Sequence, residues 1–192
     1  MSRLPPVLSR HDLPQAELLA ARLDGEVYPV ADCFCPIDEI EQSSHRGAAL
    51  AALIPGRLIA EQLTAAWVLG ATRAPPGHRQ FCTDIGARIR PAGLVSVTVR
   101  EVVIGPDEVQ NCGGLSVTAP LRTVLDLARF TPRFTSDHYR VTAELMRLGR
   151  FGAEECLATL DRRRNLPGKR RALERIVDAA ERAQPPLTRY TS

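Results

Sequence analysis

Six basic residues lie within ten positions near the C-terminal end of the 192-residue sequence, on both sides of an Asn-Leu-Pro-Gly break. They are Arg162, Arg163, Arg164, Lys169, Arg170 and Arg171. Cationic side chains bind phosphate oxygens, so this cluster predicts contacts to a nucleic-acid backbone. No aromatic residue is interleaved with it, which argues against stacking on single-stranded bases. Two alternatives are a solvated helix face paired with Asp161, Glu174 and Asp178, and contact with an acidic surface of a partner protein.

Cysteine is the second residue type that could do chemistry. The five cysteines are Cys33, Cys35, Cys82, Cys112 and Cys156. An odd number, with no recognisable signal peptide, predicts free thiols in a reducing cytoplasm. The Cys-Phe-Cys spacing is tighter than that of a zinc knuckle, and no second pair accompanies it, although His11 and His45 could in principle complete a site. We predict neither a metal nor a cofactor.

Catalysis would need a nucleophile with a base, facing carboxylates or a metal cluster. The four histidines are scattered, and none stands beside a serine or cysteine in a known motif. The adjacent acids Glu154-Glu155 and Asp38-Glu39 would point in different directions on a helix. Gly113-Gly114 is too short for a phosphate-binding loop and lacks a following Lys-Ser or Lys-Thr. We therefore predict a binding protein and not an enzyme.

The element most able to organise these residues is the stretch VTAPLRTVLDLARF, Val117–Phe130. Thr118 suits an N-cap, and Pro120 suits the first turn, where its missing N–H costs nothing. The apolar positions recur at the spacing of one helical face; they are Leu121, Val124, Leu125 and Ala128. Arg122, Asp126 and Arg129 lie four and three positions apart. The pattern predicts an amphipathic helix with a ladder of ion pairs on its surface.

The periodicity of the remaining sequence predicts an α+β fold. Further helices are predicted over residues 12–23, 45–53, 63–69, 136–148, 153–164 and 169–183. Strands are predicted over 26–30, 58–60, 80–85, 96–104, 107–112 and 115–118, the last two forming a hairpin. We expect a small, mainly antiparallel sheet packed by helices and followed by a C-terminal helical segment.

Bulk composition fits a globular protein, with 44% hydrophobic and 24% charged residues. No apolar run reaches the length of a membrane span, so no membrane partner is expected. The net charge of +3 is unevenly distributed, because residues 1–44 hold eight acids against three arginines. The acidic N-terminal region and the basic C-terminal region can attract partners of opposite charge, or can attract each other.

Three stretches resemble the AbiEi family of antitoxins, in the actinobacterial branch of type IV toxin–antitoxin and abortive-infection systems. They are Thr64–Gly70, Val117–Phe130 and Arg162–Leu173, and the resemblance covers roughly residues 45–180. In the second stretch, the residues that match the family signature are Thr118, Pro120, Arg122, Thr123, Asp126, Leu127 and Arg129.

The resemblance implies a division of the chain into three parts. Residues 1–44 would be a shortened winged-helix-like region, 45–183 an antitoxin-like core, and 184–192 a disordered tail. Within the core, the sheet would occupy 80–118 and the helices 119–183. Only one helix and one strand are predicted before residue 44. We therefore expect the DNA-reading helix to be truncated or missing.

The implied function is binding. As an antitoxin, the chain would neutralise a cognate nucleotidyltransferase-like toxin through its sheet and central helix, and would bind operator DNA to repress its own operon. Two alternatives are a stand-alone DNA-binding transcriptional regulator and a degenerate orphan that keeps only the fold.

Overall fold

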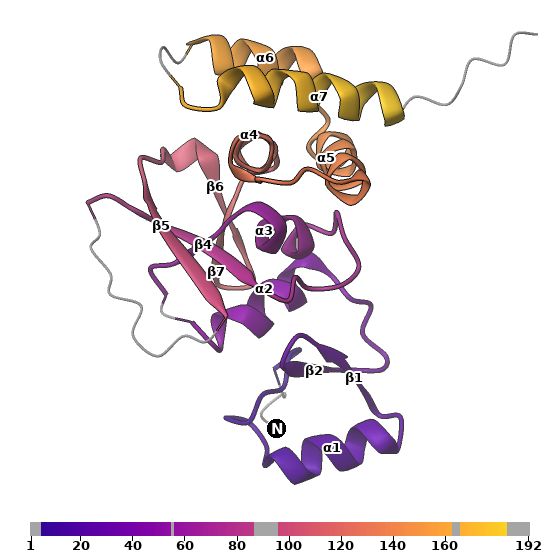
Figure 1. Ribbon diagram of the computed structural model, residues 1–192. Coiled ribbons are helices and arrows are strands. Elements are labelled where there is room, and N and C mark those ends of the chain that lie inside the picture. Colours follow the sequence, from indigo (N-terminus) through magenta and orange to yellow (C-terminus); the bar gives the residue numbers. More distant parts are fainter. Residues whose placement is uncertain (1–4, 55, 87–95, 163–165, 184–192) are drawn as a thin grey trace, which may run out of the picture. The chain divides into compact units, whose positions relative to one another are not determined.

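The computed structural model divides the chain into two compact units, Met1–Ala119 and Pro120–Ser192 (Figure 1). It describes residues 5–54, 56–86, 96–162 and 166–183. The predicted disordered tail, 184–192, lies outside these residues, and the predicted division after residue 44 stays a prediction. Within the described ranges, no helix combines the length and apolarity needed to cross a membrane.

The first unit begins with a helix and a two-stranded hairpin. Helix α1 covers Gln15–Leu23, and strands β1 (Val27–Val30) and β2 (Cys33–Pro36) pair in antiparallel fashion. Their shared apolar cluster consists of Leu8, Leu18, Val27 and Phe34. Strand β2 was not predicted, because its Cys-Phe-Cys-Pro sequence lacks polar alternation: the first three side chains are all buried.

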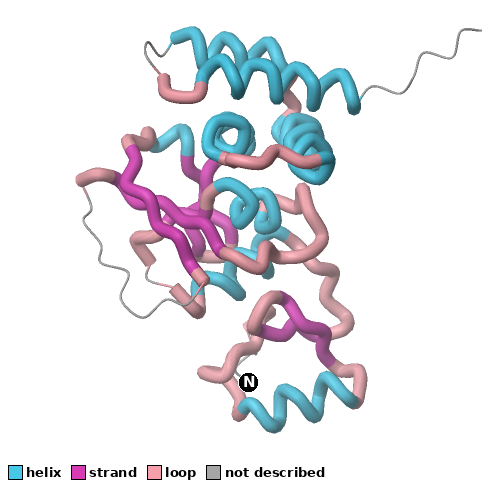
Figure 2. The backbone as a smooth tube through the Cα atoms, in the orientation of Figure 1, coloured by secondary structure: helices cyan, strands magenta, loops and turns pink. Residues whose placement is uncertain are grey.

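A five-stranded sheet forms the core of the first unit. Its strands are β3 (Ile59–Ala60), β4 (Arg79–Asp84), β5 (Val97–Val102), β6 (Val109–Cys112) and β7 (Leu115–Thr118). The spatial order is β5-β4-β3-β7-β6, with β5 and β6 at the edges. Figure 2 shows the strands in magenta and the helices in cyan. The β3–β4 and β6–β7 pairs are antiparallel, as is the β1–β2 hairpin, whereas β4–β5 and β3–β7 are parallel. The predicted α+β class is confirmed.

Two helices pack on this sheet, and one of them approaches it very closely. Helices α2 (Ser43–Ala51) and α3 (Gln62–Val68) both contact β7, and Trp67 is buried in the core. A Cβ at Gly47 of α2 would lie 1.9 Å from the carbonyl oxygen of Cys112. A Cβ at Gly113 would lie 1.9 Å from the carbonyl oxygen of Ser44. Helix α2 and the β6–β7 turn can therefore approach each other this closely only because both positions are glycine.

A buried polar network fixes the start of α3. Glu61 is 1% exposed and accepts two hydrogen bonds from Arg100, Nε to Oε1 at 2.7 Å and Nη2 to Oε2 at 2.5 Å. Gln62 follows with a left-handed φ of 49°, and its amide donates to Glu61. The side-chain oxygen of Gln80 accepts the Leu63 N–H at 3.1 Å. Arg100 is thus tied to a buried carboxylate.

In its described residues, the second unit consists of four helices: α4 (Pro120–Phe130), α5 (Ser136–Gly149), α6 (Ala153–Arg162) and α7 (Lys169–Ala183). Helix α4 contacts each of the other three, and α6 and α7 lie side by side (Figure 1). The α7 boundaries match the prediction. The unit is the predicted C-terminal helical segment.

Candidate interaction site on the C-terminal helices

The charged residues of α4, the helix that carries the family signature and is called the signature helix below, are buried. The predicted ladder of ion pairs on its surface is therefore wrong. Arg122 donates from Nε to Oδ2 of Asp126 at 2.8 Å, and Nη1 of Arg129 lies 3.8 Å from Oδ1 of the same carboxylate. The exposed fractions of Arg122, Asp126 and Arg129 are 5%, 0% and 8%. The pairing predicted from the spacing is present, but it lies inside the protein, where breaking a pair costs far more than on a surface.

The other signature residues also lie in buried or structural positions. Thr118 ends β7, and Pro120 is the first residue of α4. Thr118, Thr123 and Leu127 are all 0% exposed. These side chains act on the fold, and any direct contact with a partner must use other residues.

Two arginines of α7 bind the C-terminal end of α4. Arg175 donates from Nη1 to the carbonyl oxygens of Ala128 (2.9 Å) and Thr131 (2.7 Å), and from Nη2 to that of Pro132 (3.2 Å). Arg171 donates from Nη2 to the carbonyl oxygen of Arg129 at 2.8 Å. The last carbonyls of a helix lack intrahelical donors and carry the negative end of its dipole, so guanidinium groups stabilise them. Burial, helped by the nearby Arg171 charge, lowers the pKa of Arg175.

The turn between α6 and α7 joins the same site. Arg129 donates from Nε to the carbonyl oxygen of Pro167 at 3.2 Å. Gly168 has a φ of +75°, and a Cβ there would lie 3.2 Å from the carbonyl oxygen of Arg129. Only glycine adopts this conformation readily at so close an approach. The Leu-Pro-Gly break is therefore a contact surface for the end of α4.

The described members of the basic cluster are largely paired within the protein. Nζ of Lys169 lies 2.9 Å from Asp161, and Nε of Arg170 lies 3.2 Å from Glu174. These two contacts confirm two of the three acids expected to pair with a solvated helix face. The third acid, Asp178, instead accepts a hydrogen bond from Tyr139. Arg162 is exposed at the end of α6. Arg163 and Arg164 lie outside the described residues, and nucleic-acid binding by the cluster stays a prediction.

All five cysteines lie outside disulfides, and all are buried. Burial is the main cause that raises the pKa of Cys35 to about 11 and of Cys156 to about 12, and it also raises the pKa of Cys33 and Cys112. Within the described part of the chain, no three His, Cys, Asp or Glu residues are placed to hold a metal ion together. These thiols behave as small apolar side chains of the core.

Similarity to a known protein family supports an antitoxin or regulatory role. A sequence profile described as the AbiEi antitoxin C-terminal domain matches residues 59–174, which is more than half of the chain. The chain belongs to the AbiEi antitoxin family. The match begins at β3 and ends within α7, so the AbiEi domain includes the five-stranded sheet and the whole of α4. Membership assigns an antitoxin or regulatory role and implies a toxin partner in general.

No curated protein matches the sequence. Among solved structures, the chain is similar to the crystal structure of the RV2827C protein from Mycobacterium tuberculosis. The identity is 16% and the TM-score 0.49, with 92% of this chain and 72% of that chain covered.

Proposed function

We propose that this chain neutralises a cognate nucleotidyltransferase-type toxin by direct protein contact and represses its own operon by binding operator DNA. The observation that carries the proposal is the AbiEi antitoxin domain over residues 59–174. The mechanism would consist of contact with the toxin and recognition of the operator sequence, and the antitoxin would catalyse no reaction.

Exposed apolar residues at one edge of the sheet support the protein contact. Strand β5 is an outer strand, and the large side chains of Ile85 and Val103, at the ends of β4 and β5, are 59% and 75% exposed. Exposed apolar groups beside a sheet edge favour association with another chain. The signature residues of α4, being buried, would hold the unit in the shape that the toxin recognises.

Charge distribution favours the C-terminal end of the chain as the proposed site of operator binding. The eight acids against three arginines in residues 1–44 repel phosphates. Arg162 and Arg170 are exposed, and the side chain of Arg170 is 94% accessible despite its contact with Glu174. Exposed ion pairs are weak, so phosphates can compete with Glu174 for this guanidinium. Affinity for DNA should then fall steeply with salt.

Co-expression tests both parts of the proposal. The chain is expressed with a nucleotidyltransferase-like protein encoded by a neighbouring gene, and growth, co-purification and operator binding are measured. We expect rescue of growth, a stable complex, and DNA binding that weakens after charge reversal of the six-residue basic cluster. Operator binding without toxin binding would point to a stand-alone regulator. Failure of both would leave an orphan that keeps only the fold.

A further inference from the structure

Helix α1 has two apolar faces, and only one of them is covered. Leu18 is 1% exposed, and the half-buried Ala21 packs against the same small apolar cluster of the first unit. The opposite face, called the outer stripe below, consists of exposed residues at the i, i+3, i+4, i+7 spacing: Ala16, Leu19, Ala20 and Leu23. A stripe with this spacing usually faces a protein core. Here Leu23 is 88% exposed, so the stripe is open to a partner.

The outer stripe continues onto the segment that follows β2. Pro36 pairs with Val27 across the hairpin, and the Ile37 N–H donates to the carbonyl oxygen of Glu26 at 2.9 Å. Ile37 therefore lies beside the turn that follows Leu23, and its side chain is also exposed. Single exposed apolar residues are ordinary on a protein surface, whereas a contiguous group of them marks an interaction site.

Opposite charges border the two sides of the outer stripe. Because each residue of a helix is turned by about 100° from the one before it, Glu17 and Asp24 lie on one side of the stripe and Arg22 lies on the other. In the part of the chain that the structure describes, none of these three side chains forms an ion pair. The surface therefore carries both halves of an ion pair that it does not form within one molecule.

We propose that a second copy of this chain covers the outer stripe, with the two α1 helices parallel about a two-fold axis. Charge complementarity selects this occupant. A two-fold axis along the helices places the acidic side of each stripe beside Arg22 of the other copy, as flanking charges are placed in parallel coiled coils. Antiparallel helices would instead bring like charges together. Ala16 and Ala20 are small, so the two helices can approach closely while the leucines fill the contact.

The contact is apolar at its centre and modest in size. Nucleic acid suits this surface poorly, because residues 1–44 hold eight acids against three arginines. The same excess of acids is present in both copies and opposes their association. Each copy contributes one nine-residue helix and its neighbouring turn, which is less than a standard interface. We expect a dissociation constant on the order of 10–100 μM. Neither toxin nor operator DNA is needed for this contact.

Sedimentation equilibrium of the full chain at increasing concentration measures the association. The wild-type mass should rise from that of a monomer towards that of a dimer. Leu23→Gln should weaken the dimer by about tenfold or more, because each copy loses its most exposed apolar side chain from the contact. The variant should fold like the wild type, since Leu23 is exposed in the monomer. Ile85→Gln, another exposed isoleucine-sized site at the end of β4, is the matched control and should leave the mass unchanged.

Charge reversal tests the parallel arrangement. Arg22→Glu places acids on both sides of the stripe, and Glu17→Arg combined with Asp24→Arg places arginines on both sides. Each variant alone should stay monomeric at concentrations where the wild type pairs. Mixed in equal amounts, the two variants should pair at least as tightly as the wild type, because every contact then joins opposite charges.

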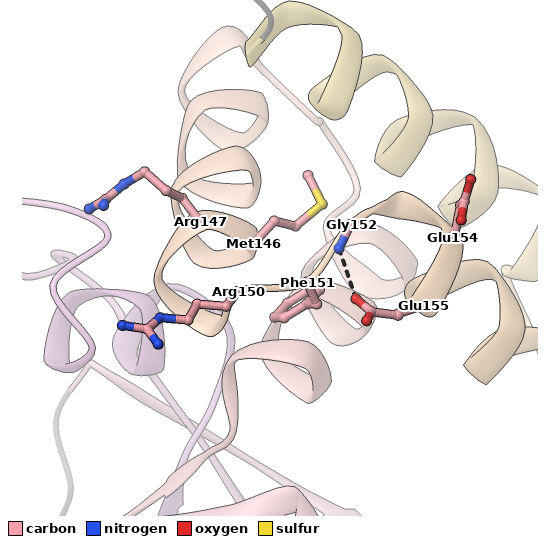
Figure 3. A pocket seen from close by; sticks show the side chains of 7 residues that line it. All are labelled: Met146, Arg147, Arg150, Phe151, Gly152, Glu154 and Glu155. Carbon is pink, nitrogen blue, oxygen red and sulfur yellow. Dashed lines mark hydrogen bonds between the residues drawn. The ribbon is translucent and has the colours of Figure 1, made fainter.

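Arg150→Glu is the control for a change of charge alone. Arg150 is exposed and follows the last residue of α5, and its side chain extends away from the acidic residues of α6 in Figure 3. Its reversal should leave the association of the chain unchanged.

A concentration-dependent dimer that Leu23→Gln weakens and the charge-reversed mixture restores would support the proposal. A wild-type chain that stays monomeric at the highest concentration would overturn it and would leave the outer stripe to a partner of different sequence. A dimer that neither Leu23→Gln nor Arg22→Glu weakens would also overturn it, since its contact would lie elsewhere. A charge-reversed mixture that stays monomeric would contradict the parallel pairing.

Discussion

Arg175 of α7 donates a hydrogen bond to the main-chain carbonyl oxygen of Ala128 in α4 over 2.9 Å. The same guanidinium also reaches the carbonyls of Thr131 and Pro132, and its carbon lies 4.7 Å from the centroid of the Phe134 ring. One side chain thus satisfies three acceptors at the end of the signature helix. A positive charge on the buried face of α7 is consequently a structural requirement of this domain.

Replacing Arg175 with Met should destabilise the second unit by about 2–4 kcal/mol, because buried carbonyls would lose their donors. Denaturant unfolding followed by circular dichroism measures this loss through the helices. Arg170→Met is the control, since its exposed pair with Glu174 should contribute no more than about 0.5 kcal/mol. Equal losses in the two variants would refute the role given to Arg175.

Gly47→Ala should destabilise the first unit by about 3 kcal/mol or more, since its methyl group would lie 1.9 Å from the Cys112 carbonyl oxygen. Gly77→Ala is the matched control: nothing lies within 4 Å of a Cβ there, and its φ is not left-handed. The fluorescence of Trp67, the single tryptophan of the chain, follows this unit during unfolding. Wild-type stability of Gly47→Ala would show that α2 does not approach the β6–β7 turn so closely.

Glu61→Gln should cost about 2–3 kcal/mol, because Arg100 would lose the carboxylate that accepts both of its hydrogen bonds. A double-mutant cycle with Arg100→Met isolates the coupling between the two side chains. The cycle for Glu144 and Arg147, a surface pair, should give less than about 1 kcal/mol. A coupling for Glu61 no larger than this control would mean that the buried pair does not hold the start of α3.

Stability should decline in alkaline solution as the buried thiols are forced to ionise. Burial raises the pKa of Cys156 from an ordinary 9.0 to about 12, so above pH 9 the folded state retains a proton that the unfolded chain loses. The free energy of unfolding should be constant from pH 7 to 8.5 and should fall from about pH 9 towards 12. Cys35, with a pKa of about 11, acts in the same direction.

Urea unfolding at several pH values measures this decline, and Cys156→Ala should make it shallower. Labelling with a thiol reagent at pH 8 supplies the control, since native thiols should react slowly and all five should react in denaturant. Fast labelling of any native cysteine, or stability independent of pH above 9, would contradict the burial described for these side chains.

Local signals in the sequence were sufficient for most elements of the fold. The Gly113-Gly114 hairpin, the helix that begins at Pro120 and the α7 boundaries follow from turn residues and periodicity, which act over a few residues. The parallel pairing of β3 with β7 joins segments more than fifty residues apart, and no local signal encodes it.

The burial of charge could not be predicted from the sequence. The sequence of α7 contains an apolar stripe of Leu173, Ile176, Val177 and Ala180, but the buried face is Ala172, Arg175, Ile176 and Ala179, while Val177 is 36% exposed. The face is rotated because Arg175 reaches the end of α4. The spacing of apolar and polar residues predicts which face of a helix is apolar. It does not predict that the end of another helix will lie opposite an arginine.

The candidate site, too, could be predicted only in part from the sequence. Sequence spacing identified the Arg122–Asp126 pair and the acids that pair with Lys169 and Arg170. It did not identify Arg150 as the left-handed residue that ends α5, although Gly149 one residue earlier was a signal available in the sequence.

The most direct test of the antitoxin assignment is size-exclusion chromatography with light scattering on the chain mixed with its nucleotidyltransferase-like partner, alongside growth of cells that express both. The account predicts a single complex whose mass contains both proteins, and growth restored by the antitoxin. Separate elution of two folded proteins, with growth still arrested, would contradict neutralisation by contact.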